Sequence, residues 1–195
     1  MNQCPLCTDR GAMTVSNVGR FVDWEGCFNA RDLGGLGALR PGALIRADSL
    51  DGLTARGWTT LSGQGVRTVI DLRNDGEAEV DHSPRPAGLT TLSIPLDGIE
   101  HRDFWDVWWG TPGFGTPAYF RPFLERFPDR VAAVARAVTA APPGGVVFHC
   151  GLGRDRTGII ALALETARWL DAGAYLRGAG LTAVELEGLR GRLGA

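Results

Sequence analysis

Short runs of β-branched and apolar residues alternate along this chain with segments of helical periodicity. Gly, Pro, Asn or Asp bound most of these runs, which is typical of strands that end in turns. Strands are therefore predicted at 20–24, 44–47, 66–72, 89–96 and 145–150. The Gly-rich sequence NARDLGGLG is predicted as a loop, and the Trp-rich and Pro-rich segment 97–117 as a loop or short helices.

Helical signals lie between these strands. One helix is predicted over 54–63, starting at Thr54, and another starts at Pro117 and ends before a Pro-Pro pair. A long apolar helix comes after the last strand, and Thr182 with Glu185 fits a capping box that opens a final helix. This alternation predicts an α/β fold with a central, mostly parallel sheet flanked by helices.

Length and composition indicate one soluble catalytic domain. Residues 1–19 are polar and aperiodic, so a flexible N-terminal tail is expected before a single domain at 20–195. No stretch approaches the roughly 18 apolar residues of a membrane helix, and no conventional secretory signal is visible, so a cytoplasmic location without membrane insertion is expected. Export by another route stays open. The net charge of −2 gives no overall attraction to nucleic acid, so an anion must bind at a local site.

The four cysteines, Cys4, Cys7, Cys27 and Cys150, lack the pattern of a disulfide scaffold. Cys4 and Cys7 form a CPLC pair, but the histidines supply no second paired motif to complete a zinc site. We therefore expect reduced thiols, no metal and no cofactor.

The sequence HCGLGRDRTG at 149–158 carries the chemistry. It places Cys150 directly after a predicted strand and Arg156 six positions later, where a helix starts. A tight loop at a helix N-terminus turns successive backbone N–H groups toward one anion, and the helix dipole adds positive potential. Gly151 and Gly153 permit such a backbone path. The same field favours the thiolate of Cys150, which makes it a candidate nucleophile for phosphoryl transfer.

The other residues of this segment have expected roles as well. Arg156 has the planar fork that binds two phosphoryl oxygens and stabilises their charge in the transition state. Thr157 is expected to hydrogen-bond the thiolate or to activate water, and His149 to orient the loop from behind. The expected phosphate cradle consists of Gly151, Leu152, Gly153, Arg154, Asp155 and Arg156.

The alternative interpretation is a buried structural cysteine at a strand end, with Arg154 and Arg156 on a solvated helix start. It does not explain why a strand, a cysteine, two glycines, an arginine, a threonine, a glycine and a helix follow in this order.

These residues resemble the bacterial atypical tyrosine phosphatases, which share an HCxxGKDRTG loop. NARDLGG at 29–35 looks like the family's NFRDLGG, LIRADSL at 44–50 like its YRSxxL, and VRTVIDLRNDGE at 66–77 like its TVIDLRxxxE. The last two predicted helices also look like those of the family. The resemblance thus covers nearly everything from residue 20 onward and implies a cysteine phosphatase-like fold.

The resemblance implies that Asp155, inside the loop, protonates the leaving group. Asp97, Asp103 and Asp106 form the alternative set, because other tyrosine phosphatases carry this acid on a separate mobile loop. The tryptophans of the same segment either stack on a phosphotyrosine ring or fill the core.

For a few further polar residues, the sequence does not decide between a role at the active site and a structural role. Arg31, Asp32 and Asp71 either brace the active-site loop or make ordinary structural bonds, and Cys27 is a candidate for a reversible disulfide with Cys150.

Two departures from the family pattern matter. Arg154 replaces a lysine that is thought to favour phosphoinositides, which puts that activity in doubt. The helical insertion that forms a lid in the family is missing between the helix after the loop and the terminal helices, so a more open active site is predicted.

The predicted function is hydrolysis of phosphotyrosine, and of phosphoserine or phosphothreonine as further substrates, through a cysteinyl-phosphate intermediate. The partner is then a phosphorylated protein or a small phosphate ester. One alternative is a phosphoinositide or small-ester phosphatase, and the other is an inactive phosphate-binding module.

Overall fold

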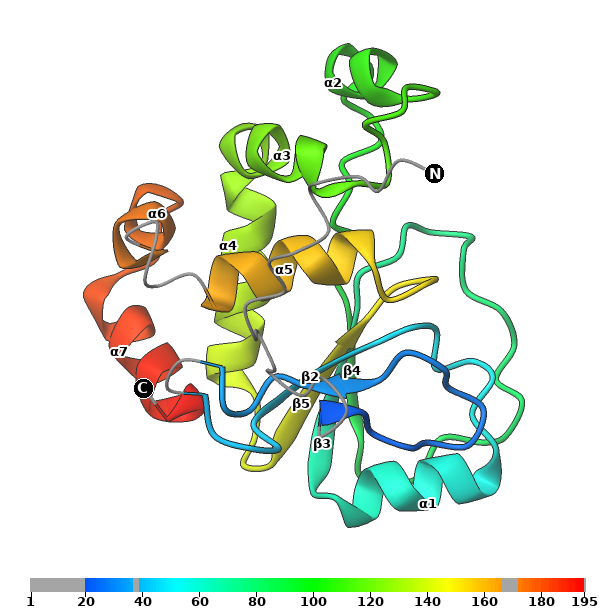
Figure 1. Cartoon of the computed structure of the whole chain (residues 1–195). Coiled ribbons are helices and arrows are strands. Elements are labelled where there is room, and N and C mark those ends of the chain that lie inside the picture. Colours follow the sequence, from blue (N-terminus) through cyan, green and yellow to red (C-terminus); the bar gives the residue numbers. More distant parts are fainter. Residues whose placement is uncertain (1–19, 37–38, 166–171, 195) are drawn as a thin grey trace, which may run out of the picture.

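The computed structural model describes residues 20–36, 39–165 and 172–194 (Figure 1). The predicted tail at 1–19, with Cys4 and Cys7, and the part of the long helix at 166–171 lie outside the described residues. The elements, in chain order, are β1 (Arg31–Asp32), β2 (Leu44–Ala47), α1 (Ala55–Gly63), β3 (Val66–Asp71), β4 (Thr90–Ser93), α2 (Arg102–Trp108), the 3₁₀ helix η2 (Pro117–Tyr119), α3 (Phe120–Arg126), α4 (Pro128–Ala140), β5 (Gly145–His149), α5 (Asp155–Glu165), α6 (Ala172–Gly178) and α7 (Ala183–Leu193).

The strands form one sheet in the order β1-β2-β5-β3-β4. The central strand β5 pairs in parallel with β2 and β3, β3 pairs in parallel with β4, and only β1 is antiparallel to its neighbour. All residues of β5 are buried, as expected for a strand covered on both faces. The predicted α/β fold with a mostly parallel sheet is confirmed.

Two predictions near the N-terminus were wrong. Residues 20–24 form no strand and contribute only isolated bridges, from Phe21 to Arg31 and from Trp24 to Cys27. The strand β1 forms instead within NARDLGGLG, where a loop was predicted. Its hydrogen bonds come from the edge of β2, a partner that the local Gly-rich sequence does not indicate.

The predicted helix starting at Pro117 is divided into η2, α3 and α4. Pro128 restricts the backbone of Phe127, which leaves the helical region at φ −126° and ψ 49°. The predicted helix starts at Thr54 and Thr182 are confirmed. Thr54 accepts a hydrogen bond from the N–H of Gly57, and Thr182 forms the full capping box of α7.

Each face of the sheet has its own core. Val147 of β5 packs with Trp58 and Leu61 of α1, whereas Val146 and Phe148 pack with residues of the helices α3 to α7. Figure 1 shows α1 on one side of the sheet and α4 and α5 on the other. The strand β5 therefore lies buried between these two layers.

The carboxyl ends of the parallel strands meet at one edge of the sheet. The register places Ala47 of β2 and Asp71 of β3 beside His149, the last residue of β5. Functional groups of open parallel sheets gather at this edge, and here the segments after β2, β3, β4 and β5 all reach it.

Candidate active site

The loop between β5 and α5 carries the candidate nucleophile. Cys150 directly follows β5 and is 4% exposed. The helix α5 begins five residues later, at Asp155, and the N–H of Gly158 donates to the carbonyl oxygen of Arg154. The predicted order of strand, cysteine, loop and helix is therefore present in the structure.

The two loop glycines differ in what the fold demands of them. Gly153 has φ +65°, and a Cβ placed there would lie 2.5 Å from the backbone N of Asp48 and 2.8 Å from the carbonyl oxygen of Ala47. Gly151 has no such φ, and a Cβ there would meet nothing within 4 Å. Only Gly153 is required by a close backbone approach and by the left-handed conformation.

Arg156 lies in the first turn of α5 and is held by two carboxylates. Its Nη2 is 2.8 Å from Glu77 Oε2, and its Nε is 3.2 Å from Asp97 Oδ2. Asn74 donates from Nδ2 to both carboxylates, at 2.6 Å to Glu77 and 2.9 Å to Asp97. Sequence reasoning missed Glu77 and Asn74 as site residues, although Glu77 is the last residue of the VRTVIDLRNDGE motif.

The two carboxylates are electrostatically different. Burial acts to raise the pKa of Glu77, but the hydrogen bond and the charge of Arg156 lower it overall. Burial also raises the pKa of Asp97, and there it outweighs the opposing effects of Arg156 and Asn74. Glu77 is thus the charged partner that orients Arg156, and Asp97 is the one better able to carry a proton.

A cavity of about 200 Å³ opens beside Arg156. Asp97 and Asp155, two of the candidates for the acid that protonates the leaving group, line this cavity. The remaining lining residues are Asn74, Glu77, Ile99, Trp105, Trp109, Phe114, Tyr119 and Arg156. The rings of Trp109 and Phe114 are stacked, with an interplanar angle of 13°. Trp105, Trp109, Phe114 and Tyr119 therefore form an aromatic wall of the cavity next to Arg156.

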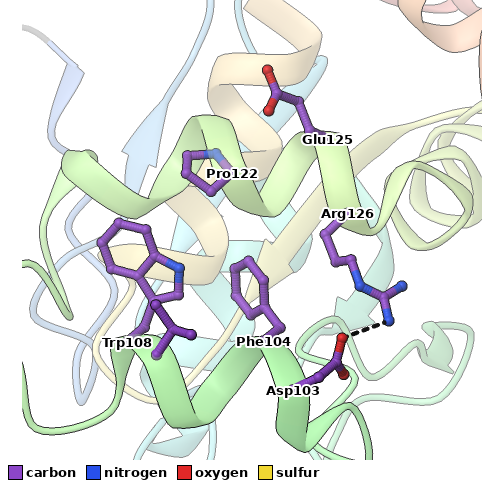
Figure 2. A pocket seen from close by; sticks show the side chains of 7 residues that line it. Asp103, Phe104, Trp108, Pro122, Glu125 and Arg126 are labelled. Carbon is purple, nitrogen blue, oxygen red and sulfur yellow. Dashed lines mark hydrogen bonds and ion pairs between the residues drawn. The ribbon is translucent and has the colours of Figure 1, made fainter.

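The other predicted acids lie elsewhere. Asp103 is 3.3 Å from Arg126 in a groove between α2 and α3, which Figure 2 shows together with Phe104 and Trp108. Asp106 pairs with Arg102 on the exposed side of α2. Neither belongs to the residues that line the cavity beside Arg156.

Behind the loop, His149 is fully buried next to a charged network. Arg73 binds Asp71 and Asp51, and His149 Nε2 lies 3.7 Å from Asp71. Burial lowers the pKa of His149 to about 4, and this effect exceeds the opposing charge of Asp71. His149 is consequently neutral at physiological pH, and Asp71 makes its strongest bonds to Arg73.

Arg31 and Asp32 make different kinds of contact. Arg31 Nε donates to Asn29 Oδ1 at 3.1 Å, and the Asn29 amide in turn contacts the active-site loop. Asp32 accepts hydrogen bonds from the N–H groups of Gly34 and Gly42, which hold its own loop together. Of the two, Arg31 is the one connected to the loop at Cys150.

Four buried polar atoms of the segment 149–158 have no hydrogen-bond partner among the described residues, namely Nδ1 and Nε2 of His149, Arg156 Nη1 and Thr157 Oγ1. Buried polar groups are nearly always satisfied, so unsatisfied ones at a loop of this shape fit an anion site. The described residues contain no group of His, Cys, Asp and Glu side chains that could hold a metal ion. In the same part of the chain, no helix is long and apolar enough to cross a membrane.

The model of the tyrosine phosphatase family matches residues 22–168, which include the loop, the cavity and the sheet. This chain belongs to the tyrosine phosphatase family. A "Tyrosine-protein phosphatase" of Nostoc commune is 34% identical over 133 residues, covering 67% of this chain and 45% of its own length. The "Triple specificity protein phosphatase PtpB" of Mycobacterium tuberculosis is 30% identical over 169 residues, covering 72% of this chain and 61% of its own.

This chain spans about half the length of the Nostoc commune relative and about three fifths of the length of PtpB. Among solved structures, a DUF442 protein of Shewanella putrefaciens aligns with a TM-score of 0.40 and 17% identity, covering 83% of this chain and 96% of that one. The resemblance to tyrosine phosphatases that the sequence motifs indicated is confirmed.

The structure also bears on the lid that other family members are expected to carry. Both α6 and α7 contact α4, and neither contributes to the lining of the cavity beside Arg156. The aromatic wall comes instead from α2 and the residues that follow it, before α3. A lid-poor site stays a prediction for the whole protein.

Proposed function

We propose that this chain is a cysteine-dependent phosphatase that hydrolyses aryl phosphate monoesters, with phosphotyrosine as its main substrate class. The observation that carries this proposal is the placement of Arg156 at a cavity walled by Trp105, Trp109, Phe114 and Tyr119. The arginine binds the phosphoryl oxygens, and the aromatic wall packs against the phenyl ring of the substrate.

In the first step, the thiolate of Cys150 attacks phosphorus, so that an S–P bond forms as the ester P–O bond breaks. The leaving phenolate takes a proton from a carboxylic acid. In the second step, water attacks phosphorus and gives a proton to the same carboxylate, the S–P bond breaks, and phosphate and the thiolate are released. Arg156 stabilises the charge on the phosphoryl oxygens in both steps.

We infer that Asp97 is the proton donor. It lines the cavity, lies 3.2 Å from Arg156, and has a raised pKa because partial burial disfavours its charged form. An acid whose pKa is closer to the working pH is a better proton donor. Asp155, to which the resemblance assigns this role, lines the same cavity and is the competing candidate.

The proposed acid can be tested by changing the leaving group. Asp97→Asn and Asp155→Asn are compared on phenyl phosphate, whose leaving group needs a proton, and on p-nitrophenyl phosphate, whose leaving group needs it far less. Asp97→Asn should lose about 10²-fold in kcat on phenyl phosphate and much less on the nitrophenyl ester. The reverse ranking of the two variants would assign the role to Asp155.

The substrate class can be tested with the aromatic wall. Trp109→Ala should raise KM for phenyl phosphate about tenfold while leaving KM for an alkyl phosphate nearly unchanged, because only the aryl group contacts the wall. Turnover of phosphotyrosyl peptides, phosphoseryl peptides and phosphoinositides by the wild type then ranks the predicted substrates. Turnover that survives in Cys150→Ser would refute the thiol mechanism itself.

A further inference from the structure

The carbonyl oxygens of the active-site loop accept hydrogen bonds from donors outside the loop. Asn29 Nδ2 donates to the carbonyl oxygens of Leu152 at 3.0 Å and of Gly153 at 3.1 Å. Two more segments supply donors, with Ser49 N bonded to Gly151 O, Arg46 Nη2 to Gly153 O and Arg154 O, and Leu72 N to His149 O. Five carbonyl oxygens within residues 149–154 thus accept hydrogen bonds from β2 and the residues that follow it, from the residue after β3, and from the NARDLGG segment.

These bonds determine which way the loop's N–H groups point. In a trans peptide unit the C=O of one residue and the N–H of the next point in opposite directions. A donor behind the carbonyl oxygens of Leu152 and Gly153 therefore turns the N–H groups of Gly153 and Arg154 to the other side of the loop. A phosphate cradle needs its N–H donors gathered in this way on one side of the loop.

Asn29 is itself held in a single orientation. Its Oδ1 accepts from Arg31 Nε at 3.1 Å, and because arginine can only donate, the amide nitrogen must face the loop. Its backbone N–H donates to Asp48 Oδ1 at 2.9 Å. Both hydrogens of the Asn29 amide are available for the two loop carbonyls.

Asp48 collects three donors from the segment that carries Asn29. Its carboxylate accepts from the N–H groups of Phe28 and Asn29 and from the thiol of Cys27. Burial, followed by the hydrogen bond to Asp48 and its charge, raises the pKa of the Cys27 thiol well above its usual range. Cys27 consequently keeps its proton and acts as a donor, a state in which thiols are poor nucleophiles.

We propose that Cys27, Asp48 and Asn29 form a positioning relay that aims the backbone N–H groups of the loop at the phosphoryl group, with Asn29 as the residue that contacts the loop. The inference rests on the proposed function, since it assigns the loop to phosphoryl binding. It gives Cys27 a role as a protonated donor in place of the disulfide with Cys150 that the sequence suggested.

The first test removes the donors of Asn29 and keeps its shape. In Asn29→Asp, the side chain still accepts from Arg31 but presents an oxygen to the two loop carbonyls. Affinity for tungstate, a phosphate-like oxyanion, is measured by calorimetry in a Cys150→Ser background, and phenyl phosphate turnover is measured with Cys150 intact. We expect about tenfold weaker tungstate binding and about 10²-fold lower kcat with a smaller change in KM.

The matched control is Thr182→Ala, which removes the side-chain hydrogen bond that caps α7, a helix that does not line the cavity beside Arg156. It should lower the melting temperature while leaving tungstate affinity and turnover unchanged. If Asn29→Asp leaves tungstate affinity and kcat at the wild-type level, or if Thr182→Ala impairs both equally, Asn29 is not a positioning residue.

The second test addresses the start of the relay. Cys27→Ser keeps a donor for Asp48, and Cys27→Ala removes it. We expect the serine variant to retain most of the wild-type kcat and the alanine variant to lose about fivefold, with little change in KM. Equal kcat in the two variants would remove Cys27 from the relay.

The two proposals can fail separately. If the wild-type protein binds tungstate with an affinity that depends on Asn29 but hydrolyses no phosphate ester, the proposed function is refuted and the relay is not. Hydrolysis that depends on Cys150 but not on Asn29 would do the opposite.

Discussion

Gly153→Ala is the substitution for which the structure gives the clearest magnitude. Alanine at φ +65° adopts the left-handed conformation at a cost of about 1–2 kcal/mol. Its Cβ would lie 2.5 Å from Asp48 N and 2.7 Å from the carbonyl carbon of Ala47, and this backbone belongs to the end of β2 and cannot rotate away. Overpacking of this kind costs a further 1–3 kcal/mol or so, so the free energy of unfolding should fall by about 2–5 kcal/mol.

The same substitution should impair catalysis beyond its effect on stability. To relieve the contact, the loop must move away from β2, and a displacement of about 1 Å at a reacting group costs about 10²-fold in rate. Urea unfolding followed by fluorescence gives the stability change, and phenyl phosphate turnover at a temperature where the variant is fully folded gives the rate.

Two other glycines serve as controls. Gly151→Ala should change the free energy of unfolding by less than about 0.5 kcal/mol, because its Cβ would meet nothing within 4 Å. Gly191→Ala, at an open position of α7, should stabilise the protein by about 0.5–1 kcal/mol and leave turnover unchanged. A Gly153→Ala protein as stable and active as wild type, or a Gly151→Ala protein that loses as much stability, would refute the steric reasoning.

Three further outcomes follow from the buried polar groups and the caps. Because the pKa of His149 is about 4 when folded and about 6.5 when unfolded, the unfolded state binds the extra proton. Stability should therefore fall by up to roughly 3 kcal/mol as the pH drops from 6.5 to 4, and urea titrations of a His149→Asn variant should show a shallower pH dependence. Arg73→Met leaves the buried Asp51 and the partly buried Asp71 without their partner and should cost about 3–5 kcal/mol, whereas a loss below 1 kcal/mol would show that the network is unimportant. Thr182→Ala should cost about 1 kcal/mol in thermal unfolding, and no change in melting temperature would contradict the capping assignment.

Local signals were sufficient for much of the fold. The helix starts at Thr54 and Thr182 were predictable because a side-chain cap depends on residues within one turn. The strands at 44–47, 66–71 and 145–149 were predictable because β-branched runs bounded by Gly, Pro or Asp suit a buried parallel sheet. The strand β1 was missed because its pairing depends on the edge of β2 and on nothing in its own sequence.

The candidate site shows the same division. Cys150 and Arg156 belong to one contiguous segment, so their spacing alone identified a loop and helix start that suit an anion. Glu77 and Asn74 come from the segment after β3, and Asp97 from the segment after β4. Their contacts with Arg156 and with one another exist only because the parallel strands end at a common edge.

The amino-acid sequence by itself determined the class of fold, the position of the loop with the candidate nucleophile, and the family, because these depend on periodicity and on residues close together along the chain. Tertiary structure alone decided that Asp97 is partly buried beside Arg156 while Asp103 faces Arg126, and that Asn29 lies behind the loop, more than a hundred residues away in sequence. The physical reason is that burial, pKa and hydrogen-bond partners are set by neighbours in space, which the folding of the sheet brings together.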